Sequence, residues 1–157
     1  TAAAPTPRRG RKSLHFPLFV DLEGKKVVVV GGGKIACRRI AVLLQFGAQV
    51  TVIAPEFLGN PQGVLWEKRP YEPGDLSGAF LVVAATDVRE VNRRVGAEAS
   101  LLQIPVSVAD CRGECTFLFP AICTGKGLVS GVISEENNHD KTVQGAIALR
   151  KALEELP

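Results

Sequence analysis

The strongest constraint on the fold is a run of four valines that is followed at once by three glycines. Val27–Val30 is continuous and β-branched, which is typical of a strand buried on both faces of a sheet. After Gly31–Gly33, apolar residues recur at helical spacing up to Gly47, where a glycine is expected to end a helix. Val50–Ile53 then supplies a second strand. This segment predicts a β-α-β unit with parallel strands.

The alternation of strands and helices continues along the chain. Further strands are predicted at Val64–Trp66, Phe80–Ala85 and Val106–Ala109. A helix with a four-residue apolar step, marked by Val91, Val95 and Ala99, lies between the last two strands. Strands that alternate with helices indicate an α/β fold with a doubly wound parallel sheet.

The glycines also form a recognisable motif, G-x-G-x-x-A, with Gly31, Gly33 and Ala36 in its three small positions. The first glycine allows a tight turn from strand to helix, the second lets a pyrophosphate approach the backbone, and the third small residue lets the helix pack closely on the strand. The start of the helix presents free N–H groups to the phosphates. We therefore expect a Rossmann-type dinucleotide site, the alternative being a glycine-rich turn without a ligand.

The pattern divides the chain into three predicted parts. Residues 1–13 are rich in Ala, Pro and Arg and are expected to be a disordered tail, and residues 14–122 form the predicted Rossmann domain. Residues 123–157 are expected to be a short extension with a strand at Leu128–Ile133, a polar loop and a helix at Lys141–Leu156.

Residues after the later strands are candidates for ligand contacts. In such sheets the ligand lies beyond the carboxyl ends of the strands. Glu56 is the acidic candidate for binding the adenosine ribose, and no Arg or Lys stands there for a 2′-phosphate, so NAD is favoured over NADP. Thr86 is expected to lie near the cofactor, and Asp87 is expected to cap the next helix. Asp110, after the strand Val106–Ala109, is either a general base or a turn residue.

Composition narrows the class of protein. A net charge of +3 without a stripe of basic and aromatic residues gives no indication of nucleic-acid binding, and no apolar run is long enough for a membrane helix. Four cysteines match no usual zinc or redox spacing, although a metal site on Cys111, Cys115 and Cys123 is an alternative. We expect reduced thiols, no metal and a cytoplasmic protein.

Several motifs together resemble the precorrin-2 dehydrogenase family, the N-terminal module of siroheme synthases. The resemblance spans about residues 16 to 133. It is carried by Phe16–Phe19, Gly31–Gly33, Gly47–Pro55, Ala84–Asp87, Val91–Val95, Val108–Asp110 and Phe117–Ala121.

The resemblance implies an NAD-dependent oxidoreductase that oxidises precorrin-2 to sirohydrochlorin in siroheme biosynthesis, and some members also insert iron. It implies that Asp110 is the catalytic residue, and it implies a homodimer. It also places cofactor contacts at Lys34, Ile35, Pro55, Glu56 and Thr86. Arg112, Lys126 and the pair Arg38–Arg39 could attract the carboxylates of this tetrapyrrole substrate.

Two features depart from the family pattern. After Ser134 the family has a Gly-Gly-x-Ser-Pro loop, whereas this chain continues with Glu135–Asp140, which contains three acids and no glycine. Many relatives also have further helices beyond the point that corresponds to Pro157, so a weaker dimer is expected here. The alternative is a non-catalytic NAD- or tetrapyrrole-binding regulatory module. Another small Rossmann protein, such as a redox sensor, is a third interpretation.

Overall fold

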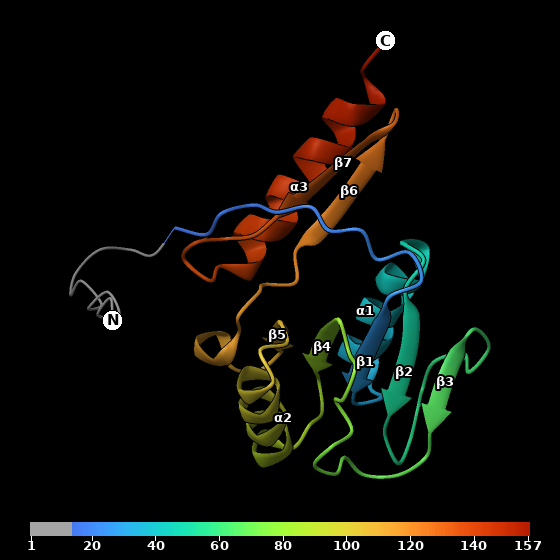
Figure 1. Ribbon diagram of the computed structural model, residues 1–157. Helices are drawn as coiled ribbons and strands as arrows, with labels where there is room; N and C mark the ends of the chain where they lie inside the picture. Colours follow the sequence, from blue (N-terminus) through green and yellow to red (C-terminus); the bar gives the residue numbers. More distant parts are fainter. Residues whose placement is uncertain (1–13) are drawn as a thin grey trace, which may run out of the picture. The chain divides into compact units, whose positions relative to one another are not determined.

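The computed structural model of the chain describes residues 14–157 (Figure 1). Its main sheet has five strands in the order β3-β2-β1-β4-β5, and every neighbouring pair is parallel. These strands are β1 (Lys26–Val30), β2 (Gln49–Ile53), β3 (Val64–Glu67), β4 (Leu81–Ala84) and β5 (Val106–Val108). The predicted α/β Rossmann-type fold is confirmed.

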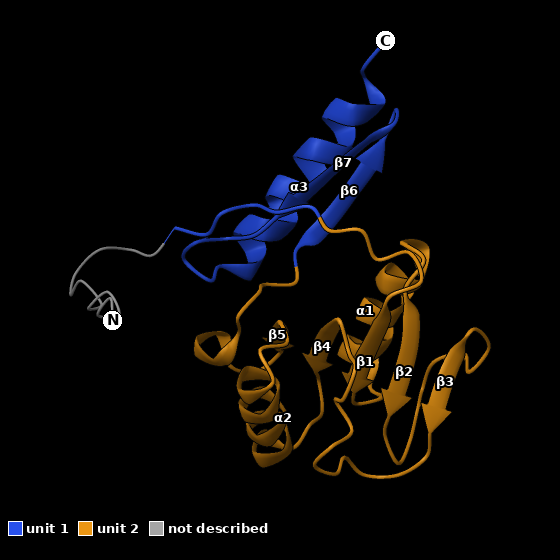
Figure 2. Cartoon of the chain, viewed as in Figure 1, with its two compact units in different colours: residues 1–19, 120–157 blue, residues 20–119 orange. Residues whose placement is uncertain are grey.

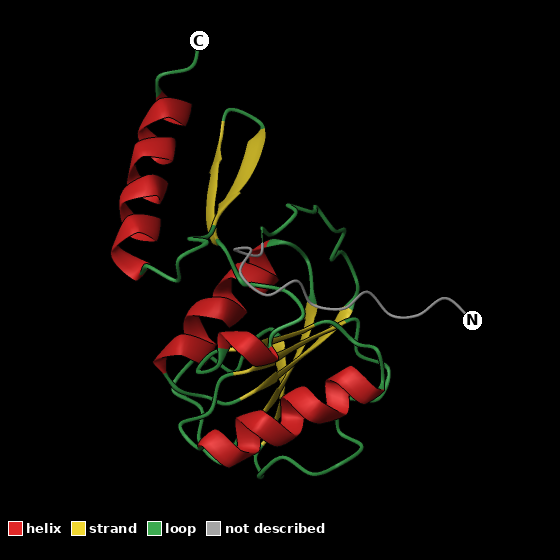
Figure 3. Ribbon diagram, turned by 90° about the vertical axis from the view of Figure 1, so that its left-hand side faces the viewer, coloured by secondary structure: helices red, strands yellow, loops and turns green. Residues whose placement is uncertain are grey.

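Helices α1 (Lys34–Gln45) and α2 (Arg89–Leu101) cover opposite faces of this sheet, as the edge-on view in Figure 3 shows. Ala36, Ile40 and Leu43 of α1 are buried against one face because they recur at the helical period. The other face packs on α2 through Val95 and Ala99. Since strand side chains alternate between the two faces, consecutive valines of β1 belong to different core clusters.

The C-terminal region is a hairpin and a helix. Strands β6 (Ala121–Gly125) and β7 (Leu128–Val132) pair antiparallel, and α3 (His139–Glu154) follows. The hairpin turn uses Lys126 and Gly127, whose φ angles are 52° and 76°. Two consecutive positive φ angles are typical of the type I′ turn that joins two-residue hairpins.

The described chain forms two compact units, which are coloured separately in Figure 2. One unit is Val20–Phe119, which holds the parallel sheet and is called the Rossmann unit below. The other, called the hairpin unit, combines β6, β7 and α3 with the described N-terminal segment 14–19. The segment 14–19, expected to belong to the Rossmann domain, thus groups with the hairpin unit. The predicted disordered tail, 1–13, lies outside the described residues.

Three local details differ from the sequence predictions. Asp87 does not cap α2, because the N-cap position is Val88, and no side-chain cap hydrogen bond is formed there. The strand β6 was not predicted from the sequence. The closing helix was predicted, and it begins at His139 instead of Lys141.

Candidate functional site

The turn between β1 and α1 is packed against two other loops through Gly31 and Gly32. Gly31 has a φ of 123°, and a Cβ atom built on it would lie 2.3 Å from the carbonyl oxygen of Ala85. A Cβ atom on Gly32 would lie 2.1 Å from the carbonyl oxygen of Glu56. Contacts this short cannot exist in a real side chain. These two glycines therefore let the loops after β1, β2 and β4 meet at one edge of the sheet.

Gly33 differs from its two neighbours because a Cβ atom on it would meet nothing within 4 Å. Gly33 is the N-cap of α1, and neither an N-cap side chain nor an acidic residue in the first turn satisfies the free N–H groups there. Lys34 and Ile35, the next two residues, are exposed, whereas Ala36 is fully buried against the sheet. The open space lies beside the positive end of a helix, which is the environment that a pyrophosphate requires.

The loop after β2 is held beside this turn by its backbone. The N–H of Leu58 donates to the carbonyl oxygen of Gly32 at 2.9 Å. Pro55 and Glu56 are both exposed at the carboxyl end of β2. The structure therefore brings together Gly32, which follows the first predicted strand, and Glu56, which follows the second.

The loop after β4 depends on a buried amide that the sequence analysis did not single out. Asn92, on α2, has no exposed surface. Its Oδ1 accepts hydrogen bonds from the backbone N–H of Thr86 at 3.0 Å and from the Thr86 hydroxyl at 2.8 Å, while its Nδ2 donates to the Thr86 carbonyl at 3.0 Å. These hydrogen bonds fix Thr86 at the edge of the sheet. The signal in the sequence that could have identified Asn92 was its position six residues after Thr86.

Asp110 follows β5, the strand next to β4, so it lies at the same edge of the sheet as Thr86. Its Oδ1 accepts a hydrogen bond from Nη1 of Arg89 at 2.5 Å. Arg89 also donates to Glu114 from its other terminal nitrogen. Desolvation lowers the pKa of Arg89, but its hydrogen bond to Glu114 and the charge of Asp110 outweigh this effect and raise that pKa. Neither Arg89 nor Glu114 was predicted as a site residue from the sequence.

Arg39 is the half-buried cation of the expected Arg38–Arg39 pair. Its guanidinium donates to the Ser107 hydroxyl at 3.1 Å and lies 5.2 Å from the ring centre of Phe119. Desolvation by burial lowers the pKa of Arg39, a nearby Cys115 raises it and Arg38 lowers it further. The side chain of Arg39 is therefore engaged within the Rossmann unit.

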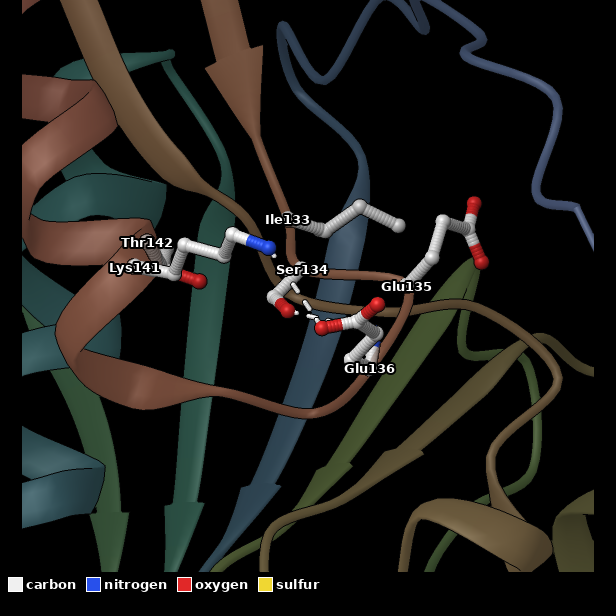
Figure 4. Close-up of a pocket in the computed structure, with 6 residues that line it drawn as sticks. All are labelled: Ile133, Ser134, Glu135, Glu136, Lys141 and Thr142. Carbon is white, nitrogen blue, oxygen red and sulfur yellow. Dashed lines mark hydrogen bonds and ion pairs between the residues drawn. The ribbon is translucent and has the colours of Figure 1, made fainter.

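The acidic loop of the hairpin unit lines a pocket with Ile133, Ser134, Glu135, Glu136, Lys141 and Thr142 (Figure 4). The Ser134 hydroxyl accepts hydrogen bonds from the backbone N–H groups of Glu136 and Asn138. Lys141 extends toward Glu136, with 3.4 Å between Nζ and Oε2. The loop is thus organised by its own polar groups.

The cysteines contribute no ligand set. All four are unpaired. Within residues 14–157, no group of three or more His, Cys, Asp or Glu side chains could hold a metal ion. In the same part of the chain, no helix has the length and apolar character needed to cross a membrane.

The glycine turn, the open space at the start of α1 and the parallel sheet define a Rossmann-type dinucleotide-binding domain. Residues 18–121 match the model of the family NAD_binding_7, described as "Putative NAD(P)-binding". The chain belongs to this family, which confirms the predicted NAD-binding class.

The named relatives that the chain resembles are proteins of siroheme biosynthesis. The chain is 45% identical over 144 residues to the "Probable multifunctional siroheme biosynthesis protein HemA" of Ruminiclostridium josui, a match that covers 87% of this chain and 28% of that protein. It is 43% identical over 125 residues to the siroheme synthase of Methylobacillus flagellatus, which covers 76% and 27% of the two chains. The chain thus spans about a quarter of the length of these curated relatives.

The fold of this chain is also similar to that of a solved structure. It is named "SirC, precorrin-2 dehydrogenase", and the TM-score is 0.72 at 27% sequence identity. The match covers 88% of this chain and 71% of that one. Together with the siroheme synthases, this likeness confirms the resemblance to the precorrin-2 dehydrogenase family that the sequence motifs indicated.

Proposed function

We propose that the chain oxidises precorrin-2 to sirohydrochlorin, with NAD as the acceptor, in siroheme biosynthesis. The observation that carries the proposal is the open space at Gly33, which lies at the start of α1 in a turn that Gly31 and Gly32 pack tightly. The names of the similar proteins supply the substrate. A cytoplasmic location is part of the proposal, because four unpaired cysteines are typical of a reducing compartment.

The proposed reaction removes a hydride and a proton from the tetrapyrrole. Bound NAD would supply the redox chemistry, as the acceptor of the hydride. We assign its binding to Gly31, Gly33, Lys34, Ile35, Ala36, Pro55, Glu56 and Thr86. The carboxylate of Asp110 accepts the proton, and the rest of the site orients the two reactants.

A non-catalytic binding module is the competing class. Such a module has no use for a carboxylate at the position of Asp110. The two interpretations therefore differ in what Asp110 does, and a variant of this residue distinguishes them.

The proposal includes a homodimer formed through the hairpin unit. The described helix α3 exposes Val143 and Ile147, which are four residues apart and lie on one face. The described segment 14–19 and β7 also expose large apolar side chains: Leu14, Phe16, Leu18, Phe19, Leu128 and Val129. Apolar surface gathered in one small unit is typical of a protein interface.

Cofactor binding is tested with Gly33→Val. Gly113→Val is the matched control, because a Cβ atom on Gly113 also meets nothing within 4 Å. Gly33→Val is expected to raise the Kd for NAD at least tenfold in calorimetric titration without lowering the thermal midpoint, and the control is expected to bind normally. An unchanged Kd in a folded Gly33→Val protein would refute the assignment.

Catalysis is tested with Asp110→Ala and precorrin-2, by the absorbance of NADH. Loss of a general base is expected to reduce turnover by roughly 10²–10⁴-fold while the Kd for NAD stays nearly unchanged. If Asp110 only stabilises a turn, the variant keeps its rate and shows a lower thermal midpoint. That outcome would favour the binding module.

A further inference from the structure

Arg89 links two carboxylates that come from different elements of the Rossmann unit. It is the first residue of α2, whereas Asp110 follows β5 and Glu114 belongs to the short 3-10 helix η1 (Arg112–Glu114). One terminal nitrogen of Arg89 lies 2.5 Å from Oδ1 of Asp110, and the other bonds to Oε2 of Glu114. An arginine holds two acceptors in this way because its guanidinium is a rigid, planar fork.

The close packing of α2 brings these three groups together. A Cβ atom on Gly96, further along α2, would lie 3.1 Å from a methyl group of Val108 and 3.7 Å from a carboxylate oxygen of Glu114. The glycine therefore lets the helix lie directly against β5 and η1. Arg93, one turn after Arg89, instead bonds to Glu90 at 2.6 and 2.8 Å.

Stability does not account for this arrangement. The side chains of Arg89, Asp110 and Glu114 are 44%, 39% and 33% exposed. Ion pairs at this degree of exposure contribute little to the free energy of unfolding. The same contacts can matter for the orientation of a catalytic group, since a displacement of about 1 Å in such a group can reduce the rate about 100-fold.

We propose that Arg89 is the positioning residue for Asp110, and that Glu114 anchors Arg89. The inference rests on the proposed function, in which Asp110 accepts the proton. Arg89 holds the carboxylate in one orientation at the carboxyl end of β5. Glu114 occupies the second arm of the guanidinium, so that Arg89 has one preferred conformation.

Kinetics with precorrin-2 tests the role of Arg89 through Asp110. Arg89→Gln is expected to lower kcat at least tenfold, with the KM for NAD unchanged, and Arg89→Lys is expected to restore only part of the rate. Glu114→Gln is expected to lower kcat by a few fold. Arg93→Gln is the matched control on the same helix and should keep the normal kcat.

A double variant separates positioning from a general structural role. In an Asp110→Asn background, Arg89→Gln should cause no further loss of kcat, because its effect passes through the missing carboxylate. A full further loss in that background, or a normal kcat for Arg89→Gln, would overturn the inference.

Crystal structures decide the inference independently of activity. In Arg89→Gln the Asp110 carboxylate is expected to leave its wild-type position or to occupy several, whereas in Arg93→Gln it should stay. An unmoved, well-ordered Asp110 in Arg89→Gln would overturn the positioning role even if the protein proved not to oxidise precorrin-2. Absence of NADH formation by the wild type would count against the proposed function alone.

Discussion

The two compact units of the described chain bury their apolar side chains to different extents. In the Rossmann unit, strands β1 and β4 are almost completely inaccessible, and all of the largest fully buried side chains belong to this unit. In the described part of the hairpin unit, only Cys123 and Ala146 are buried apolar residues. Burial of apolar area is the main source of folding free energy. The Rossmann unit thus has a core of its own, whereas the hairpin unit has little.

The two units also differ in the surface that they expose: apolar side chains in the hairpin unit, and open space beside a glycine turn in the Rossmann unit. A two-stranded hairpin is marginal in water unless further surface covers it. In the hairpin unit, α3 covers part of β6, where Leu153 packs on Gly125 and the thiol of Cys123 donates to the Ala146 carbonyl at 3.5 Å. The apolar residues left exposed on α3 and β7 are those that the proposed dimer would cover. In the Rossmann unit, in contrast, Gly33 borders open space at the start of α1, where we propose that NAD binds.

The largest effect on stability is expected for Leu76→Ala, which removes a fully buried side chain from the cluster under α2. The cavity and the lost transfer free energy should lower the free energy of unfolding by about 2–5 kcal/mol. Leu128→Ala, in the hairpin unit, is the matched control, because Leu128 is 50% exposed. Urea unfolding of dilute protein measures both. Equal losses would show that the contrast between the two units is wrong.

A smaller loss is expected for Asn92→Leu, which leaves the backbone N–H and carbonyl of Thr86 without their amide partner. An unsatisfied buried group costs about 1–3 kcal/mol. Asn60→Ala is the control, since Asn60 is exposed and accepts a single hydrogen bond from the N–H of Gln62. Thermal unfolding and NAD titration are measured on the same samples. Normal NAD affinity in folded Asn92→Leu would show that Thr86 does not contact the cofactor.

A substitution on the surface of the hairpin unit is expected to weaken self-association and to leave the stability of the monomer unchanged. Ile147→Lys places a charge on the α3 surface, where Ile147 is 59% exposed. We expect the dimer to weaken at least tenfold, with the unfolding midpoint of the monomer unchanged. Leu65→Lys, at an exposed position of β3, is the control. If sedimentation velocity shows equal association for both variants and the wild type, the dimer does not use α3.

The elements of the Rossmann unit could be predicted from the sequence because they depend on local patterns. The valine run, the glycines and the helical spacing of Ala36, Ile40 and Leu43 each determine the neighbouring structure. In the hairpin, the strand at Leu128–Ile133 was predicted, whereas its partner β6 was missed because β6 has no alternating pattern. The signal that could have revealed it was Gly125-Lys126-Gly127, since glycine-rich dipeptides are typical of two-residue hairpin turns.

Part of the candidate site could be proposed from the sequence. Gly33 and Asp110 are candidates because their places in the glycine motif and after a predicted strand identify them. The partners of Asp110 could not be predicted, because Arg89 lies 21 residues away in sequence and meets it only when α2 packs on β5. Gly32 looked like a variable position of the motif, and only the close approach of Glu56 explains why a glycine is needed there.

The smallest effect on the free energy of unfolding is expected for substitutions in the ion pairs of the two units. In the Rossmann unit, Asp75 accepts two hydrogen bonds of 2.8 Å from Arg69 and one of 2.7 Å from the N–H of Glu72, and its side chain is 11% exposed. The bonds to Arg69, opposed by desolvation and assisted by that N–H, hold the pKa of Asp75 below its ordinary value. In the hairpin unit, Glu136 and Lys141 form a more exposed pair.

Asp75→Asn should therefore lower the free energy of unfolding by about 1 kcal/mol at pH 7. A carboxylate whose pKa is lower in the folded state stabilises the protein above its unfolded pKa of about 3.9, and this contribution is lost as the pH falls through the lower folded value. The difference between wild type and Asp75→Asn should thus be constant from pH 7 to pH 5 and shrink below about pH 4. Glu136→Gln should change the free energy by less than about 0.5 kcal/mol at pH 7. Urea titrations at several pH values measure both, and a difference for Asp75→Asn that grows on acidification would contradict the assigned sign.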